Sequence, residues 1–398
     1  MEGKVSRASR KLESSPIQEL SQLAQTCGAI NLAEGFPDFP APPHLKAAAL
    51  SAITADFNQY RHVQGICHLL ATQMKDHHGI AVNALSDFVI CCGQSEAFAA
   101  SIFAIVDPGD EVLLFDPAYE TYESCILLAG GIPVYVPLSP PDWSFKKDEL
   151  MKYFTSRTKA VVLNSPHNPT GKVFTKDELE TISEACKIME CFAITDEVYE
   201  YITYDRELHI SLASLPGMQE RTIITSSLSK TFSVTGWRIG WACAPANIAS
   251  AIRNIHVKIT DSAPAPFQEA ALTALQSPPD YYCSLRTEYE ARRDYVVQIL
   301  SVLGFQVRFK PKGSVFIFAE LPDHCELSDI EFVKKLIEKA GVAAVPGCGF
   351  FHTTRQPQDG EKYQRRYIRF AFCKSGETLS AARQKMEKCV NEDGQLCL

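Results

Sequence analysis

Lys230 lies in the segment 227–238, which is rich in serine and threonine and follows the apolar run 222–226. A deprotonated lysine amine can form an imine with an aldehyde. Hydroxyl groups and a guanidinium bind phosphate, and Arg238 comes eight positions after the lysine (238 − 230 = 8). The segment therefore predicts an aldehyde-binding lysine beside an anion site. The alternative for so short a motif is an ordinary surface lysine after a strand.

An aldehyde and a phosphate occur together on pyridoxal phosphate, and two residues at the end of another apolar run suit that cofactor. Its ring accepts electrons when the ring nitrogen is protonated, and a buried carboxylate beside that nitrogen secures the proton. Asp196 ends the run 192–196, where its charge needs a partner. Tyr199 could bond the ring oxygen and lower the pKa of the imine. The alternatives are a capping aspartate and a packing tyrosine.

Three further segments carry groups that suit the same cofactor. Asn168 precedes a proline, so its backbone is extended, and its amide could bond the ring oxygen. Gly93, Gln94 and Ser95 lie between a predicted strand and a predicted helix, and a helix N-terminus there could bind phosphate. Tyr119 could stack on the pyridine ring. The alternatives are a plain turn, a strand–helix turn and a core aromatic residue.

Arg369 is a candidate anchor for a substrate carboxylate. It lies in the apolar run 367–372, where a charged side chain needs an anion. A guanidinium can bind a carboxylate through two parallel hydrogen bonds. The alternative is a buried ion pair with an aspartate or glutamate of the same chain.

Composition indicates an ordinary globular protein. The chain has 398 residues, 22% of them charged, and a net charge of −8, which argues against binding to a nucleic-acid backbone. No apolar run reaches the roughly 18 residues of a membrane span, and residues 1–14 lack the apolar core of a secretory signal. The 14 cysteines are scattered without a Cys-x-x-Cys pair, so no metal site is predicted. Buried free thiols in the cytoplasm are expected.

The elements that must position these groups follow an α/β pattern. Continuous apolar runs indicate strands that are buried on both faces of a sheet, and they cover 87–93, 111–116, 159–164, 192–196 and 222–227. Helix-like segments separate them, such as 175–189 with Thr175 as its N-cap. The pattern predicts a mostly parallel sheet, with ligands bound at the carboxyl ends of its strands. The residues expected at those ends are Gly93, Asn164, Asp196 and Ser227.

A second, smaller α+β domain is expected after about residue 275. An amphipathic stretch at 281–303 is followed by strand-like runs at 314–318 and 367–372. We expect residues 44–275 to form a large cofactor-binding domain. Residues 1–43 and 276–398 would form the small domain.

Taken together, these motifs resemble those of the fold-type I, class I aminotransferases, and most of all the kynurenine, glutamine and methionine aminotransferase group. The resemblance covers nearly the whole chain. Segment 31–39 (NLAEGFPDF) is similar to the family's LxxGxPDF segment, and 58–60 to its QY motif. The gaps from Asn168 to Asp196 (196 − 168 = 28) and from Asp196 to Lys230 (230 − 196 = 34) are also like those of the family.

The resemblance implies a homodimer that moves the α-amino group of an amino acid to a 2-oxo acid by ping-pong chemistry on pyridoxal phosphate. It implies that Lys230 binds the cofactor, that Tyr119 stacks on its ring, and that Gly35 and Asn168 assist Arg369 at the substrate carboxylate. It further implies a phosphate site made of Ser95, Ser227, Arg238 and, from the neighbouring chain, Tyr60. No nucleic acid and no membrane is an expected partner.

The sequence departs from the family in the side-chain pocket. Animal kynurenine aminotransferases line this pocket with aromatic residues and a histidine, and the matching positions here are Ile17, Ser95, Asp261 and Ser262. We therefore expect a more polar pocket, with methionine, glutamine, phenylalanine or kynurenine as the donors to consider. Bacterial relatives that take dicarboxylates have a lysine at the position of Ser95, so aspartate is less expected.

The sequence leaves three other functions to consider. A β-lyase such as a C–S lyase, or an aspartate-type aminotransferase, would carry the same cofactor residues on the same scaffold. A non-catalytic ligand-sensing domain would carry a DNA-binding extension, and the roughly 30 residues before Gly35 give no room for a helix-turn-helix domain, so this function is less expected.

Overall fold

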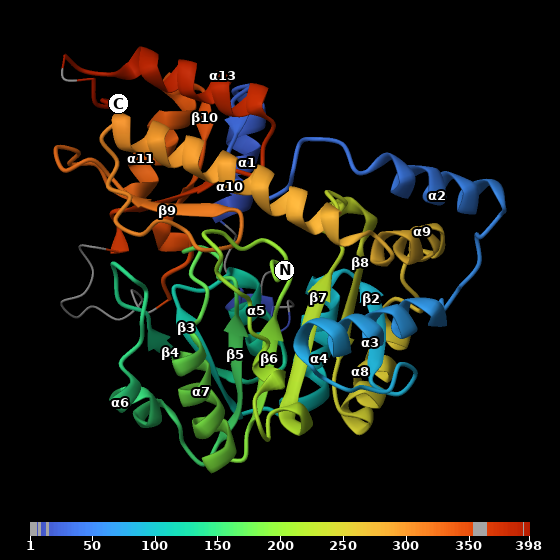
Figure 1. Ribbon diagram of the computed structural model, residues 1–398. Helices are drawn as coiled ribbons and strands as arrows, with labels where there is room; N and C mark the ends of the chain where they lie inside the picture. Colours follow the sequence, from blue (N-terminus) through green and yellow to red (C-terminus); the bar gives the residue numbers. More distant parts are fainter. Residues whose placement is uncertain (1–5, 7–8, 13–15, 353–363, 393) are drawn as a thin grey trace.

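A seven-stranded sheet forms the centre of the fold. The computed structural model describes residues 6, 9–12, 16–352, 364–392 and 394–398 (Figure 1). In spatial order the strands are β2 (Phe88–Cys92), β8 (Ile239–Cys243), β7 (Thr222–Ser227), β6 (Phe192–Asp196), β5 (Thr158–Asn164), β3 (Glu111–Asp116) and β4 (Ile132–Pro137). All five strands predicted from the apolar runs are confirmed, and so is the mixed α/β fold.

The sheet is parallel except for β8, which runs antiparallel to both β2 and β7. The sequence analysis did not predict β8. Its run is short and contains Gly240, where an added Cβ would lie 2.4 Å from the carbonyl carbon of Gly93. This glycine weakens the strand signal, but it lets β8 pack closely against the turn that follows β2.

Helices cover both faces of the sheet, as the burial of the strands requires. One face packs against α4 (Gln94–Ile105), α5 (Glu120–Leu128) and α8 (Ala246–Ile259). The other packs against α3 (Gln64–His78), α7 (Lys176–Ile188) and α9 (Ala265–Leu275). The predicted helix at 175–189 is confirmed, and Thr175 caps it in a reciprocal capping box with Glu178.

A second group of elements lies above the carboxyl edge of the large sheet in Figure 1. Its antiparallel sheet has the order β11 (Val345–Pro346), β12 (Tyr367–Ala371), β9 (Phe316–Glu320). The N-terminal β1 (Ile30–Asn31) pairs with β10 (Val342–Ala343). The surrounding helices are α1 (Pro16–Thr26), α10 (Pro279–Val302), α11 (Asp329–Lys335) and α13 (Gly376–Met386). The strand predicted at 314–318 begins two residues later than expected.

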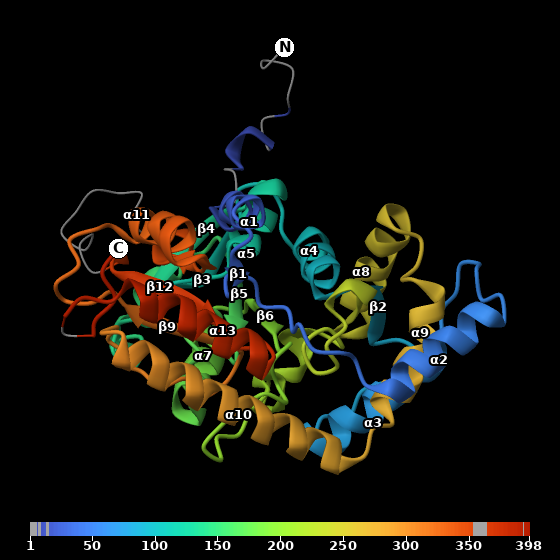
Figure 2. The ribbon, with the colours of Figure 1, turned by 90° about the horizontal axis from the view of Figure 1, so that it is seen from above.

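The remaining helices are short or peripheral. Helix α2 (Pro43–Thr54) lies along α9 at one edge of the molecule (Figure 2). The other short elements are α6 (Lys147–Leu150), a π-helix at Leu336–Ala340, and 3₁₀ turns at Ser9–Lys11, Met151–Tyr153, Leu212–Ser214, Gln219–Arg221, Thr235–Trp237, Gly347–Gly349 and Glu387–Cys389. Among the described residues, none of the helices has the length and apolar character that a membrane span requires.

Candidate active site

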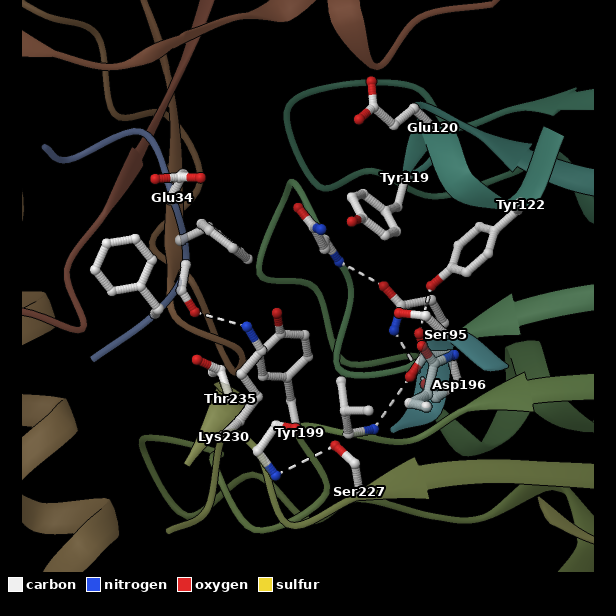
Figure 3. A pocket seen from close by; sticks show the side chains of 18 of the residues that line it. Glu34, Ser95, Tyr119, Glu120, Tyr122, Asp196, Tyr199, Ser227, Lys230 and Thr235 are labelled. Carbon is white, nitrogen blue, oxygen red and sulfur yellow. Dashed lines mark hydrogen bonds between the residues drawn. The ribbon is translucent and has the colours of Figure 1, made fainter. Parts of the chain in front are cut away.

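A cavity of about 360 Å³ opens at the carboxyl ends of β5, β6 and β7, beneath the second group of elements (Figure 3). The strand order brings these ends together, because the parallel strands all point to the same edge. Most of the residues singled out in the sequence line this cavity: Gly35, Gln94, Ser95, Tyr119, Asn168, Asp196, Tyr199, Ser227, Lys230, Arg238 and Arg369.

The amine of Lys230 projects into the cavity from the loop between β7 and β8. Its Nζ donates a hydrogen bond of 2.6 Å to the carbonyl oxygen of Gly35 and lies 5.9 Å from the ring centroid of Tyr199. Burial lowers the pKa of the amine to about 8. Near neutral pH, Lys230 is thus far easier to deprotonate than an ordinary lysine, as a nucleophilic amine requires.

Asp196, the last residue of β6, places a buried carboxylate in the cavity wall. The Tyr122 hydroxyl donates to one carboxylate oxygen over 2.7 Å, and the backbone N–H of Val198 donates to the other over 3.2 Å. Burial nevertheless raises the pKa of this carboxyl to about 6. A cationic N–H group in the cavity would restore the ionised form.

Another wall of the cavity forms an anion cradle at the N-terminus of α4. Gly93 precedes this helix with a φ of +81°, and an added Cβ would lie 2.2 Å from a guanidinium nitrogen of Arg238. The guanidinium donates to the carbonyl oxygens of Thr235 and Cys92, over 2.9 and 3.1 Å. With Ser95 and Ser227 also lining this region, the donors suit a phosphate.

Arg369 is buried in β12 and reaches the cavity from the side opposite the large sheet. One guanidinium nitrogen donates to Oδ1 of Asn168 over 2.9 Å, and another donates to the carbonyl oxygen of Ala33 over 2.7 Å. Its Nε is buried without a hydrogen-bond partner among the described residues. Its hydrogen-bond partners in the described structure are an amide and a backbone carbonyl, so the alternative of a structural ion pair gains no support there.

Three of the sequence-predicted residues lie away from the cavity of their own chain. Tyr60 follows α2 and is 79% exposed. Asp261 and Ser262 follow α8, and neither lines the cavity. Ile17 lies in the first turn of α1, but its side chain is outside the described part of the structure.

The cavity also contains residues that sequence reasoning missed. Tyr122 lies in the first turn of α5, three positions after Tyr119, and the two rings are in contact, while the Tyr122 hydroxyl donates to Asp196. The ring of Phe316 stands 4.1 Å from the Arg369 guanidinium carbon, and its register in β9 would have placed it diagonally across from that residue. Two carboxylates, Glu34 and Glu120, also line the cavity, and Glu34 directly precedes Gly35 in the recognised N-terminal segment.

The donor set fits pyridoxal phosphate. The α4 cradle suits the phosphate, and the close approach of Arg238 to Gly93 leaves no room for a side chain there. Asp196 suits a protonated ring nitrogen because burial disfavours its ionised form and a cationic N–H group would stabilise that form. The Lys230 amine suits the aldehyde, and the unpartnered Nε of Arg369 suits a further carboxylate.

Comparisons with known proteins agree with this geometry. The family model "Aminotransferase class I and II" matches residues 28–378. The human kynurenine–oxoglutarate transaminase 1 is 34% identical over 411 residues, which cover 95% of this chain and 96% of that protein.

Two solved structures share the fold over almost the whole chain. The N-succinyldiaminopimelate aminotransferase of Mycobacterium tuberculosis superposes with a TM-score of 0.90 at 36% identity, covering 96% of this chain and 98% of that one. The methionine aminotransferase YbdL of Escherichia coli gives a TM-score of 0.89 at 33% identity, with the same coverage. The chain therefore belongs to the class I and II aminotransferases, and it is a fold-type I, pyridoxal-phosphate-dependent transaminase.

Proposed function

We propose that the cavity of Figure 3 is the active site and that Lys230 is the residue that binds the cofactor covalently. The observation that carries the proposal is the position of the Lys230 amine. It is buried, its pKa is lowered to about 8, and it shares the cavity with a buried acid and a buried guanidinium. A surface lysine after a strand would have none of these features.

The proposed cofactor contacts follow from the donors around the cavity. Gly93, Gln94 and Ser95 would hold the phosphate at the start of α4, together with Ser227 and Arg238. Asp196 would hold the proton of the ring nitrogen, and Tyr122 orients its carboxylate. The remaining contacts to the ring and its oxygen are assigned to Tyr119, Asn168 and Tyr199.

When bound, pyridoxal phosphate supplies an aldehyde that condenses with amines and a ring that takes up the electron pair released at the substrate α-carbon. Nζ of Lys230 would accept the proton that leaves that carbon, and in the reverse half-reaction it would return a proton to the α-carbon of the new amino acid. The lowered pKa of Lys230 suits both roles, since an efficient acid–base group titrates near the working pH.

Arg369 would bind the α-carboxylate of the substrate. Its two bonded nitrogens are fixed by Asn168 and Ala33, so the guanidinium plane is oriented before a substrate arrives. Phe316 and Phe350 flank the guanidinium, with its carbon 4.1 and 4.6 Å from their ring centroids, and they exclude water from it. Gly35 lines the same cavity, where an added Cβ would lie 2.4 Å from the Phe316 ring.

We also propose a division into two domains and a homodimer. Residues 44–275 would form the cofactor-binding domain, and residues 1–43 with 276–398 the small domain, because β1 pairs with β10 and not with the large sheet. The dimer is supported by the exposed side chains of Tyr60 (79%), Leu50 (65%) and Ile53 (50%) along and after α2. The fourteen free cysteines support a reducing compartment such as the cytoplasm.

For the substrate, we propose a neutral or aromatic amino acid, with methionine, glutamine, phenylalanine and kynurenine as candidates. The carboxylates of Glu34 and Glu120 line the cavity, and Ser95 brings no positive charge to it. A second substrate carboxylate would therefore meet like charges. The names of the similar kynurenine and methionine aminotransferases support the same class.

Borohydride treatment of the pyridoxal phosphate form should fix the cofactor irreversibly to Lys230, because this amine is the nucleophile of the cavity. Peptide mapping by mass spectrometry would locate the label. Lys230→Arg should abolish labelling, whereas Lys374→Arg, which changes another buried lysine, should retain it. A label on Lys374 or any other lysine would refute the assignment.

Arg369→Ala should lower kcat/KM roughly 30-fold to several thousand-fold. The loss of a charge-assisted contact to the carboxylate removes about 2–5 kcal/mol of transition-state stabilisation. Cofactor absorbance should be retained. The variant should also lose the preference for an amino acid over the corresponding decarboxylated amine. Arg308→Ala, at an arginine paired with Glu320 on the surface, is the control and should leave kcat/KM unchanged. Near-normal kinetics in Arg369→Ala would assign the carboxylate to another group.

Mixing Lys230→Ala chains with Tyr60→Ala chains should restore activity if Tyr60 completes the site of the partner chain. In an equal mixture that exchanges subunits freely, about half the dimers are mixed, and one of the two sites in each mixed dimer is intact. About a quarter of all sites should therefore be active. Activity before and after mixing, with light scattering for mass, tests this. A fully active monomer, or no gain on mixing, contradicts the shared site.

Aspartate should be a poor donor, with kcat/KM about a hundredfold or more below methionine, glutamine and phenylalanine, because of repulsion between like charges in a partly desolvated cavity. Glu34→Gln and Glu120→Gln should narrow this gap. Asp261→Asn serves as the comparison variant. It should reduce the difference in kcat/KM between aspartate and the other donors only if a second chain brings Asp261 to the cavity. Aspartate that matches the other donors in the unmodified enzyme would overturn the proposed substrate class.

A further inference from the structure

The segment 196–201 lies between two cavities. Asp196, Val198 and Tyr199 line the active-site cavity. Glu200 and Tyr201 line a separate cavity of about 400 Å³. His78, at the end of α3, and His209 line this second cavity as well. Glu197 contacts His209 and, through Thr195, the end of β6.

The side chains behind the active site form a compact group of metal-ligand type. The nearest ligand atoms of His78, Glu197 and Glu200 all lie within 4.8 Å of one another. Nε2 of His78 is 3.1 Å from Oε2 of Glu200, and Nε2 of His209 is 2.7 Å from Oε2 of Glu197. The side chains of Glu197 and His209 are each only 4% exposed.

Hydrogen bonds orient both carboxylates so that one oxygen of each faces a histidine. Oε1 of Glu197 accepts from Thr195 and Ser211, over 2.8 and 2.9 Å. Oε1 of Glu200 accepts from Ser226 over 3.4 Å. Oε2 of Glu200 is thereby directed at His78, and Oε2 of Glu197 at His209, in the way that hydrogen bonds around a metal site direct its ligands.

We propose that His78, Glu197 and Glu200 form a binding site for a divalent transition-metal ion, with its fourth position open to the second cavity. One imidazole and two carboxylates supply nitrogen and oxygen ligands of the kind that zinc takes, and their two negative charges match a divalent ion. Tetrahedral zinc spaces its ligand atoms by about 3.4 Å, so the 3.1 Å between His78 and Glu200 needs little change.

His209 would act from outside the ligand set. It would donate Nε2–H to Glu197, the pattern in which a hydrogen-bond partner fixes a metal-bound carboxylate. In this tautomer its buried Nδ1 carries a lone pair and no proton, and Nδ1 has no partner among the described residues. The second cavity would give an ion its path to the site.

A proton on His78 is the competing occupant. Burial disfavours the charged imidazole, but Glu200 and Glu197 outweigh burial and raise the pKa of His78. Burial also raises the pKa of Glu197, but His209 and His78 outweigh it and lower the pKa to about 2. Without metal, the protonated form of His78 would therefore pair with Glu200, and binding of the metal would displace this proton.

The other group of possible ligands in the described structure, Cys91, Glu96 and His256, is less suitable. Burial raises the pKa of the Cys91 thiol well above its ordinary value, so that the thiolate needed for binding is disfavoured.

Equilibrium dialysis of the chelator-treated holoenzyme against zinc, followed by metal analysis, tests the proposal. We expect one zinc per chain that depends on this site. His78→Gln and Glu200→Gln should each weaken its binding at least about tenfold. His77→Gln, which changes a histidine that lines the same cavity but contacts Tyr201, should retain it. Cys91→Ala should also retain it, which separates the two ligand groups.

Thermal unfolding supplies a second measurement. Saturating zinc should raise the Tm of the holoenzyme and of His77→Gln, but should leave the Tm of His78→Gln unchanged, because a ligand that binds only the folded state stabilises it. If zinc is not retained, or is retained equally by His78→Gln and Glu200→Gln, the group is an ion-pair network and the proposal is wrong.

Discussion

The buried guanidinium of Arg369 holds together three parts of the chain that are distant in sequence. From β12 it bonds to Asn168, which follows β5 in the large sheet, and to the carbonyl oxygen of Ala33 in the N-terminal segment. A charge placed at this depth must be satisfied, so these acceptors cannot move independently of it. The positions of Gly35 and of its bond to Lys230 follow from the same constraint.

Burial shifts the neighbouring groups in opposite directions, because it always disfavours the charged form. It lowers the pKa of the Lys230 amine to about 8 and raises that of the Asp196 carboxyl to about 6. The two pKa values thereby move toward neutral pH, that of Lys230 from above and that of Asp196 from below. In the proposed mechanism, Lys230 must lose and regain a proton near neutral pH and Asp196 must ionise beside a cationic ring, and burial in one cavity favours both.

The sequence predicted what depends on local pattern. Continuous apolar runs identified the strands, and the polar residues at their ends marked the edge where Asp196 and Ser227 meet. It missed β8, whose glycine interrupts the pattern, and Tyr122, whose role depends on how α5 lies against β6. Tyr60 and Asp261 do not line the cavity of their own chain, although the resemblance implied a place for each in the site.

Contacts between residues far apart in sequence escape pattern reasoning altogether. His78 and Glu197 are 119 positions apart (197 − 78 = 119), and no short motif relates them. The loops that join the elements decide such contacts, and single-sequence patterns say little about loop paths. The same limit applies to Glu34 and Glu120, which reach one cavity from opposite parts of the chain.

Strand β8, the single antiparallel strand of the large sheet, determines how freely the Lys230 loop can move. Because β8 returns directly beside β7, the loop with Lys230 is closed at its base by the pairing of Ser227 with Gly240 and by the bond from Leu228 to Ile239. Further bonds from Phe232 to Leu228 and from Val234 to Ser229 stiffen it. These hydrogen bonds hold the backbone around Lys230 in place. Its amine therefore moves by rotation about its own side-chain bonds, and in the proposed mechanism the reacting carbon of the substrate must lie within reach of that side chain.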